Sequence, residues 1–283
     1  MLYNRLFVII YKVVYKGSMK KINFLPNVVT AFGLACGLYV IFKASMTEIG
    51  TYDFLHQMVL VLILAGVADV LDGALARAIK AESEFGLIFD SLSDAISFGV
   101  APAVLLLKSL SLNQGDFLSF FALASATLYA VCGVLRLGRF NVRAKLAKPE
   151  DKKVFLGLPI PAAAISLVSP VLVLNSSYMK HYFPGFEISH TFVLSSVAII
   201  IGYLMVSKIK FPSQKMIQLQ RPLSFKYLFL GSLLAISIFY GLFYGLSIFL
   251  FILSWGYVLV SLLMALSRLI TKKKLEKRRK AKK

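Results

Sequence analysis

Four aspartates lie within 26 residues of one another in a strongly apolar chain: Asp69, Asp72, Asp90 and Asp94. A charged side chain costs about 2.5–3.5 kcal/mol to insert at the centre of a membrane helix, so such residues are functional candidates. Carboxylate oxygens with no nearby Cys or His favour Mg²⁺, Mn²⁺ or Ca²⁺ over zinc or copper. Carboxylates that bridge two divalent ions are a common arrangement for phosphoryl transfer. The aspartates therefore predict a divalent-metal site that acts on a phosphate group.

The spacing of the aspartates puts each pair on one face of a helix. Asp69 and Asp72 are three residues apart, and Asp90 and Asp94 are four apart. The short segment at 82–84 makes the two helices antiparallel neighbours, so the two acidic faces can meet. The alternative is that these aspartates are helix-end residues paired with loop lysines, but four at these spacings exceed what a helix end requires.

Two glycines and an arginine accompany the aspartates. Gly73 and Gly86 would let a ligand or a neighbouring helix approach the backbone closely, although ordinary helix packing would explain either glycine alone. Arg77 follows Asp69 by two helical turns and can supply a fixed cation to a phosphate or to the carboxylates.

The composition predicts an all-α polytopic membrane helix bundle. Of the 283 residues, 58% are hydrophobic and 16% charged, and the mean hydropathy is +0.78. A soluble domain would carry about a quarter charged residues, so a soluble globule is excluded. The apolar fraction also excludes a disordered chain and a soluble nucleic-acid binder. About 20 apolar residues cross a bilayer, which predicts eight spans at 27–46, 54–76, 86–107, 117–136, 158–175, 191–207, 227–243 and 246–267.

The cations of this chain, with a net charge of +19, predict its orientation. With eight spans, 29 of the 32 Lys and Arg residues lie on the side that holds both termini, and only Lys43, Lys108 and Lys180 lie on the other. The positive-inside rule then places both termini in the cytoplasm. Because the aspartates fall at the cytoplasmic ends of spans two and three, we expect the active site at the cytoplasmic face.

Four regions are expected along the chain. Residues 1–25 read as an amphipathic, basic segment at the membrane surface, unless translation begins at Met19 and residues 1–18 are not made. The catalytic core is expected at 26–222 and two additional spans at 223–270. The basic tail at 271–283 is expected to contact anionic lipid. Cys36 and Cys132 lie in apolar runs and predict neither a disulfide nor a zinc site.

The acidic motif resembles the complete signature of the CDP-alcohol phosphotransferase family. It reads Asp69-x-x-Asp72-Gly73-x-x-Ala76-Arg77, then eight residues, then Gly86-x-x-x-Asp90-x-x-x-Asp94. The resemblance implies a six-helix membrane core, a homodimer, and two divalent cations held over a CDP-linked lipid, Mg²⁺ or Mn²⁺ with Ca²⁺ as a further candidate. It assigns all four aspartates as metal ligands, with Asp94 also the general base for the acceptor hydroxyl. The residues that it assigns to the CDP-lipid pocket are Gly73, Ala76, Arg77 and Gly86.

A second family feature is the run Pro26–Thr30 at the start of the first span. Asn27 and Thr30 are three residues apart and can hydrogen-bond a nucleotide or diphosphate. The residues alone fit a helix start with a polar cap equally well. The family resemblance favours contact with the CDP-lipid.

The acceptor alcohol is expected to bind near a basic run after the fourth span. Arg136, Arg139 and Arg143 are spaced on one helix face, with Asn141 between them. Such arginines suit a phosphate or the carboxylate of an acceptor. They also fit topological positive charge and contact with anionic lipid head groups, and the residues alone do not decide between these uses.

Three looser motifs resemble the CDP-diacylglycerol–serine phosphatidyltransferases within the family. They are R-x-x-R-F-N at 136–141, F-x-G-L-P-x-P-A-A-A at 155–164 and K-I-K-F-P-S at 208–213. The resemblance implies transfer of the phosphatidyl group of CDP-diacylglycerol to L-serine by direct displacement, giving phosphatidylserine and CMP.

Several alternatives stay open. The same chemistry could serve glycerol 3-phosphate or an inositol phosphate, or could join serine to an archaeal CDP-archaeol. A phospholipase-D-like mechanism is excluded, because none of His56, His181 and His190 begins an H-x-K motif. A divalent-cation transporter would hold its ions near the bilayer midplane on interrupted helices, whereas these aspartates are expected at helix ends. A membrane scaffold has only the basic tail in its favour.

Overall fold

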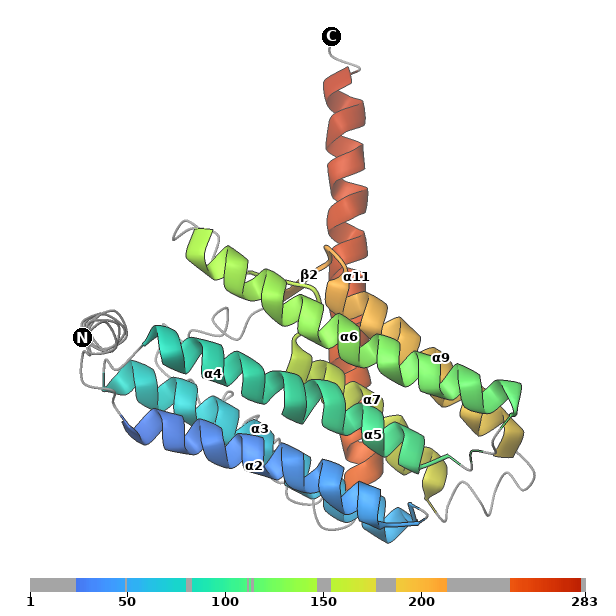
Figure 1. Ribbon diagram of the computed structural model, residues 1–283. Helices are drawn as coiled ribbons and strands as arrows, with labels where there is room; N and C mark the ends of the chain where they lie inside the picture. The colour runs from blue at the N-terminus through green and yellow to red at the C-terminus, as the bar shows by residue number, and fades with distance from the viewer. Residues whose placement is uncertain are drawn as a thin grey trace, which may run out of the picture.

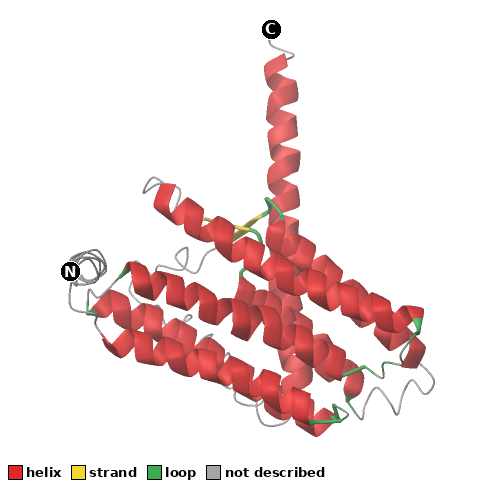
Figure 2. Ribbon diagram, viewed as in Figure 1, coloured by secondary structure: helices red, strands yellow, loops and turns green. Residues whose placement is uncertain are grey.

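The protein is a bundle of long helices (Figure 1). The computed structural model describes residues 24–48, 50–79, 83–110, 112, 115–146, 154–176, 187–212 and 245–280. The helices are α2 (Phe24–Met46), α3 (Tyr52–Ala78), α4 (Glu84–Asp94), the π-helix η1 (Ala95–Val100), α5 (Ala101–Lys108), α6 (Phe117–Leu146), α7 (Ile160–Asn175), α9 (Glu187–Val206) and α11 (Leu246–Lys280). Apart from two three-residue strands, the elements of the described chain are helical (Figure 2), which confirms the predicted helical bundle.

Five helical segments of the described residues are long and apolar enough to cross a membrane: Leu25–Met46, Tyr52–Ala78, Glu84–Lys108, Phe117–Arg143 and Leu246–Ser267. The third comprises α4, η1 and α5 in succession. Two shorter apolar helices, Ile160–Asn175 and His190–Val206, fall where spans five and six were expected. The chain is therefore a multi-pass membrane protein. The expected span at 227–243 and the amphipathic segment before residue 24 lie outside the described residues, and the orientation stays a prediction.

Small residues let α2 pack tightly against the third spanning segment. A Cβ atom built on Gly37 would come within 2.7 Å of Ser97 Cα, so a larger residue would push η1 away from α2. Ser97 Oγ donates to the carbonyl oxygen of Gly33 at 3.1 Å, and Ser93 Oγ donates to that of Thr30 at 3.4 Å. These contacts hold the acidic end of α4 against the start of α2.

A short antiparallel ribbon joins the segments that follow α6 and α9. Strands β1 (Val154–Leu156) and β2 (Lys210–Pro212) pair with Phe155 opposite Phe211. Gly157 follows with φ +80°, and a Cβ atom there would overlap the carbonyl group of Met205. Only glycine fits this backbone conformation and contact. The expected G-L-P motif is therefore a tight turn that leads into α7.

Helices α7 and α11 complete the bundle. Most of α7 from Ile160 to Leu172 is buried, because it packs against α3, α5, α9 and α11. Ser169 Oγ and Ser254 Oγ are 3.1 Å apart and link α7 to α11. In Figure 1, α11 runs steeply across the other helices, and its C-terminal part extends beyond the bundle.

Candidate active site

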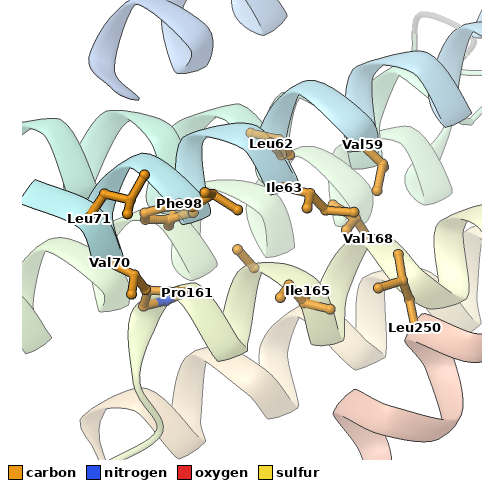
Figure 3. A pocket seen from close by; sticks show the side chains of 13 residues that line it. Val59, Leu62, Ile63, Val70, Leu71, Phe98, Pro161, Ile165, Val168 and Leu250 are labelled. Carbon is orange, nitrogen blue, oxygen red and sulfur yellow. The ribbon is translucent and has the colours of Figure 1, made fainter. Parts of the chain in front are cut away.

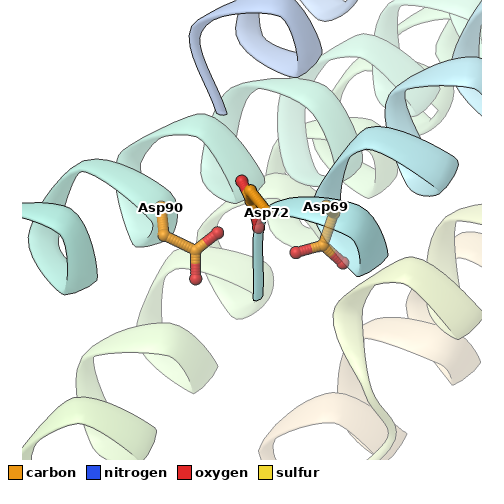
Figure 4. A group of neighbouring side chains, drawn as sticks. All are labelled: Asp69, Asp72 and Asp90. Carbon is orange, nitrogen blue, oxygen red and sulfur yellow. The ribbon is translucent and has the colours of Figure 1, made fainter. Parts of the chain in front are cut away.

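Three of the predicted aspartates converge in space. Asp69 and Asp72 come from α3, Asp90 comes from α4, and one carboxylate oxygen from each lies within 4.8 Å of the other two (Figure 4). Three ionised carboxylates at this separation repel one another by about 3 kcal/mol per pair at an effective dielectric constant of roughly 20. Among the described residues, no salt bridge neutralises any of them. Such a cluster is stabilised when a cation binds.

Asp94 lies beside this cluster without belonging to its closest group. It lines the same small cavity as the other three aspartates, one helical turn after Asp90. Thr30, Ser93, Ser97 and Phe98 contribute to the walls. The predicted association of the four aspartates thus has two parts, a compact three-carboxylate cluster and a fourth carboxylate at its edge.

Thr30 contacts the cluster directly. Its hydroxyl group donates to Asp72 Oδ2 at 2.5 Å and lies 3.1 Å from the carbonyl oxygen of Pro26. Both Thr30 and Asp72 are 5% exposed. The bond orients the Asp72 carboxylate within the cluster.

Gly73 makes room for the arginine one turn later. A Cβ atom at Gly73 would lie 3.3 Å from Arg77 Nη1, so the guanidinium group folds back along α3. There it interacts electrostatically with Asp72. Arg77 is exposed, and Ala76 beside it is half-buried. This part of the motif brings a cation to the edge of the acidic cluster.

Asn27 and Gly86 meet where α2 and α4 begin. A Cβ atom at Gly86 would lie 3.3 Å from Asn27 Oδ1 and 3.0 Å from Ser83 Oγ. Ser83 is the N-cap of α4 and accepts a hydrogen bond from the Gly86 amide at 3.0 Å. The absence of a side chain at Gly86 therefore lets the Asn27 side chain lie close to the start of α4.

Arg136, one of the predicted acceptor-binding residues, interacts electrostatically with the acidic site. It is only 8% exposed, its charge acts on Asp94, and its Nε atom has no hydrogen-bond partner within the described part of the chain. The guanidinium carbon lies 5.9 Å from the centre of the Phe140 ring. A buried guanidinium with an unused donor is suited to binding an anionic ligand.

The other residues of the basic run have different surroundings. Arg139 donates from Nη1 to the carbonyl oxygen of Val206 at the end of α9. Asn141 Nδ2 donates to Ser91 Oγ at 2.9 Å, which joins α6 to the residue after Asp90. Arg143 is exposed. The residues predicted as one group therefore do not share one environment.

An apolar pocket of about 390 Å³ adjoins the acidic cavity. Side chains of α3, η1, α7 and α11 form its walls (Figure 3). Phe98 lines both the apolar pocket and the acidic cavity, and Val70 and Leu71 of the pocket lie between Asp69 and Asp72 in the chain. A ligand with its apolar tail in this pocket would bring a charged head group close to the acidic cluster.

The donor chemistry of the cluster fits a hard divalent cation. All three ligand groups are carboxylates and they are close enough to share an ion. Mg²⁺ and Mn²⁺ prefer such oxygen donors, whereas zinc and copper sites are richer in His or Cys. Asp69, Asp72 and Asp90 would hold the metal.

Comparison with known proteins identifies the family. The sequence pattern of the CDP-alcohol phosphatidyltransferase family matches residues 23–209. The chain belongs to this family. The match includes all four aspartates and every helix from α2 to α9, so the site lies within the family's shared region.

The chain is similar to several members of this family that carry related names. A CDP-diacylglycerol–serine O-phosphatidyltransferase of Helicobacter pylori is 35% identical over 236 residues, which cover 81% of this chain and 92% of the relative. A protein of the same name from Methanocaldococcus jannaschii is 35% identical over 195 residues, covering 69% and 77%. An archaetidylserine synthase of Methanothermobacter thermautotrophicus is 36% identical over 160 residues, covering 56% and 59%.

Several residues that line the acidic cavity are not predicted from the sequence. Ser93, Ser97 and Phe98 line the acidic cavity, and Gly33 lies against it from α2. Gly33 and Gly37 form a small-x-x-x-small pattern, which predicts that α2 packs closely against another helix. This pattern could have indicated that Gly33 lies at the site. Neither the π-helical turn η1 nor the partner of Arg139 had a comparable signal in the local sequence.

Proposed function

We propose that this protein transfers the phosphatidyl group of CDP-diacylglycerol to the hydroxyl group of L-serine, giving phosphatidylserine and CMP. The observation that carries the proposal is the carboxylate cluster of Asp69, Asp72 and Asp90, with Asp94 in the same cavity. The names of the Helicobacter and Methanocaldococcus relatives support serine as the acceptor.

Asp69, Asp72 and Asp90 would hold a divalent cation where the diphosphate end of the lipid binds. When bound, Mg²⁺ or Mn²⁺ neutralises the diphosphate and stabilises the charge that develops on the departing CMP. Arg77 lies at the edge of the cluster and interacts with Asp72, where its guanidinium supplies a further cation to a phosphate. Asn27, Thr30, Gly73, Ala76 and Gly86 complete the proposed CDP-lipid site.

Asp94 accepts the proton of the serine hydroxyl group. The serine oxygen forms a bond to the phosphorus that carries diacylglycerol, while the bond from that phosphorus to the CMP oxygen breaks. The hydroxyl proton passes to the Asp94 carboxylate. Its place at the edge of the three-carboxylate cluster supports this role, because a base must lie close to the acceptor hydroxyl group beside the reacting phosphorus.

The apolar pocket takes part of the diacylglycerol chains. Its walls are almost entirely aliphatic, and it shares Phe98 with the acidic cavity. The diphosphate would then lie against the acidic cluster and a chain beside α3. Arg136, buried and interacting with Asp94, binds the serine carboxylate. The active site and both termini face the cytoplasm, and the homodimer remains a prediction from the family resemblance.

One relative favours a second candidate. The archaetidylserine synthase from Methanothermobacter is 36% identical to this chain. It is named for the archaeal lipid product, so CDP-archaeol is a candidate lipid donor with the same acceptor.

Purified protein in detergent tests both candidates. It is incubated with Mn²⁺, CDP-diacylglycerol or CDP-archaeol, and one labelled alcohol at a time: L-serine, glycerol 3-phosphate or an inositol phosphate. Of the three alcohols, we expect only serine to release CMP, with labelled phosphatidylserine formed from CDP-diacylglycerol; labelled archaetidylserine formed from CDP-archaeol would support the second candidate. CMP release only with glycerol 3-phosphate would refute serine as the acceptor. With the protein reconstituted into liposomes, Mn²⁺ flux without CMP release would refute the transferase and support a transporter.

A further inference from the structure

The third spanning segment changes its hydrogen bonding immediately after Asp94. Residues Ala95–Val100 form the π-helix η1, in which the Ala101 amide bonds to the carbonyl oxygen of Ile96, five residues back. A π-helical turn accommodates about one extra residue, and each residue turns a helix by about 100°. The turn therefore decides how the acidic face of α4 is oriented relative to the packing face of α5.

Pro102 and Tyr129 meet at this turn. Pro102 lies in the first turn of α5 and has no amide hydrogen, so it cannot donate to the carbonyl oxygen of Phe98 four residues earlier. The hydroxyl group of Tyr129 on α6 donates to that carbonyl oxygen at 2.8 Å. Tyr129 is 0% exposed. In an apolar interior an unpaired carbonyl group is costly, so Tyr129 compensates for the proline.

The opposite side of η1 is fixed by α2. Ser97 Oγ bonds to the Gly33 carbonyl oxygen, and η1 lies so close to α2 that a Cβ atom on Gly37 would come within 2.7 Å of Ser97 Cα. The π-helical turn is thus held between a hydrogen bond from α6 and a close contact with α2.

The turn carries the residue that separates the two halves of the site. Phe98 is 4% exposed and lines both the acidic cavity and the apolar pocket. Asp94 precedes it by four residues and Asp90 by eight. A change in η1 would move this ring and both carboxylates of α4 relative to Asp69 and Asp72 on α3.

We propose that Tyr129, with Pro102, selects the π-helical turn at Ala95–Val100 and thereby positions Asp90 and Asp94 against the aspartates of α3. Tyr129 is a positioning residue: it lines neither the acidic cavity nor the apolar pocket and acts through the backbone at Phe98. The effect on turnover rests on the function proposed above, whereas the effect on metal binding does not.

The first experiment compares Tyr129→Phe with Tyr203→Phe. Tyr203 is a 69%-exposed residue of α9 and serves as the matched control for loss of a tyrosine hydroxyl. For folded, monodisperse protein we expect Tyr129→Phe to lower kcat for CMP release roughly ten- to a hundred-fold, as small displacements of catalytic groups do. Mn²⁺ binding, measured by electron paramagnetic resonance of the free ion, is expected to weaken. A kcat and an Mn²⁺ affinity equal to those of Tyr203→Phe would overturn the proposal.

The second experiment adds Pro102→Ala to Tyr129→Phe. The introduced alanine supplies an amide that can bond to the Phe98 carbonyl oxygen in an ordinary α-helical turn. We therefore expect the melting temperature lost in Tyr129→Phe to recover, while kcat and Mn²⁺ affinity stay low. Recovery of all three would overturn the proposal, because Tyr129 would then merely satisfy a carbonyl group. Failure of the melting temperature to recover would overturn the role given to Pro102.

Two further comparisons keep the test decisive. If Tyr129→Phe does not yield folded protein, Ser97→Ala loosens η1 from the side of α2, and unchanged kcat and Mn²⁺ affinity in that variant would overturn the proposal. If the wild-type protein releases no CMP with CDP-diacylglycerol and serine, the proposed function fails. The Mn²⁺ affinities of the variants still decide the present inference.

Discussion

The hydroxyl group of Thr30 on α2 and Asp72 Oδ2 on α3 are 2.5 Å apart and form a buried hydrogen bond. The two residues come from different spanning helices, so the bond aligns the Pro26–Thr30 run with the acidic motif. It also fixes one oxygen of a carboxylate that belongs to the three-aspartate cluster. The polar residue at the start of the first span is therefore part of the support of the metal site.

Replacing Thr30 tests this support. Thr30→Val removes the hydroxyl group, and we expect Mn²⁺ affinity to weaken roughly 10- to 100-fold, as is usual when a partner of a metal ligand is lost. Thr30→Ser keeps the donor and should stay near wild type. Titration of Mn²⁺ by paramagnetic resonance measures both. Equal affinities in Thr30→Val and the wild type would show that the bond does not support the cluster.

Asp94→Asn separates catalysis from lipid binding. The amide cannot take the serine proton, so we expect kcat to fall roughly 100- to 10,000-fold, the contribution typical of a general base. Binding of CDP-diacylglycerol should change far less, because the three-carboxylate cluster remains. Asp53→Asn, in the first turn of α3 and exposed, is the matched control. Turnover of Asp94→Asn near that of the control would remove Asp94 from the role of base.

Local sequence periodicity predicts that the aspartates of α3 and α4 come together in space. The spacing of Asp69 and Asp72, and that of Asp90 and Asp94, sets each pair on one helix face, and the short connection between α3 and α4 brings the faces together. Helical spacing and a short connection are enough to predict this proximity without tertiary information.

The parts that were not predicted depend on contacts between distant residues. The π-helical turn after Asp94 is paired with Tyr129, 31 residues away from Phe98, and Arg139 finds its acceptor at Val206, 67 residues away. The period of the basic run suggested a common role for Arg136, Arg139 and Arg143, yet their neighbours on other helices give each a different environment. Local pattern cannot supply those neighbours.

Gly157 is expected to be essential to the turn before α7. Gly157→Ala would force a residue with a side chain into φ +80° and bring its Cβ atom onto the Met205 carbonyl group. Gly115→Ala is the control, since Gly115 has φ +86° with no atom within 4 Å of a built Cβ. Backbone strain alone costs about 1–3 kcal/mol, and we expect Gly157→Ala to lose more. Melting temperatures in detergent compare the two. A similar loss in both variants would mean that the backbone yields to the added atom.

Replacing each of the three arginines of α6 by methionine should affect different properties of the protein. Arg136→Met removes the buried guanidinium beside Asp94, and we expect KM for serine to rise roughly ten-fold or more, as the loss of a charged hydrogen-bond partner implies. Arg139→Met should mainly lower the melting temperature, because Arg139 bonds to the end of α9. Arg143→Met should change neither property. Serine kinetics and thermal melts measure these effects. An unchanged KM for serine in Arg136→Met would place the acceptor carboxylate elsewhere.

Filling the apolar pocket should discriminate among lipid donors by chain length. Val67 lines the pocket and is 49% exposed, whereas Val131 on α6 is 48% exposed and lies outside it. We expect Val67→Trp to raise KM severalfold for long-chain CDP-diacylglycerol, because the indole occupies space that a chain would fill, and to have little effect with a short-chain analogue. Val131→Trp should behave as wild type with both. Initial rates of CMP release at varied lipid fraction in mixed micelles give the values. If Val67→Trp impairs the short-chain analogue as strongly as the long-chain lipid, the substitution disturbs the neighbouring acidic cavity and the pocket is not where the chains bind.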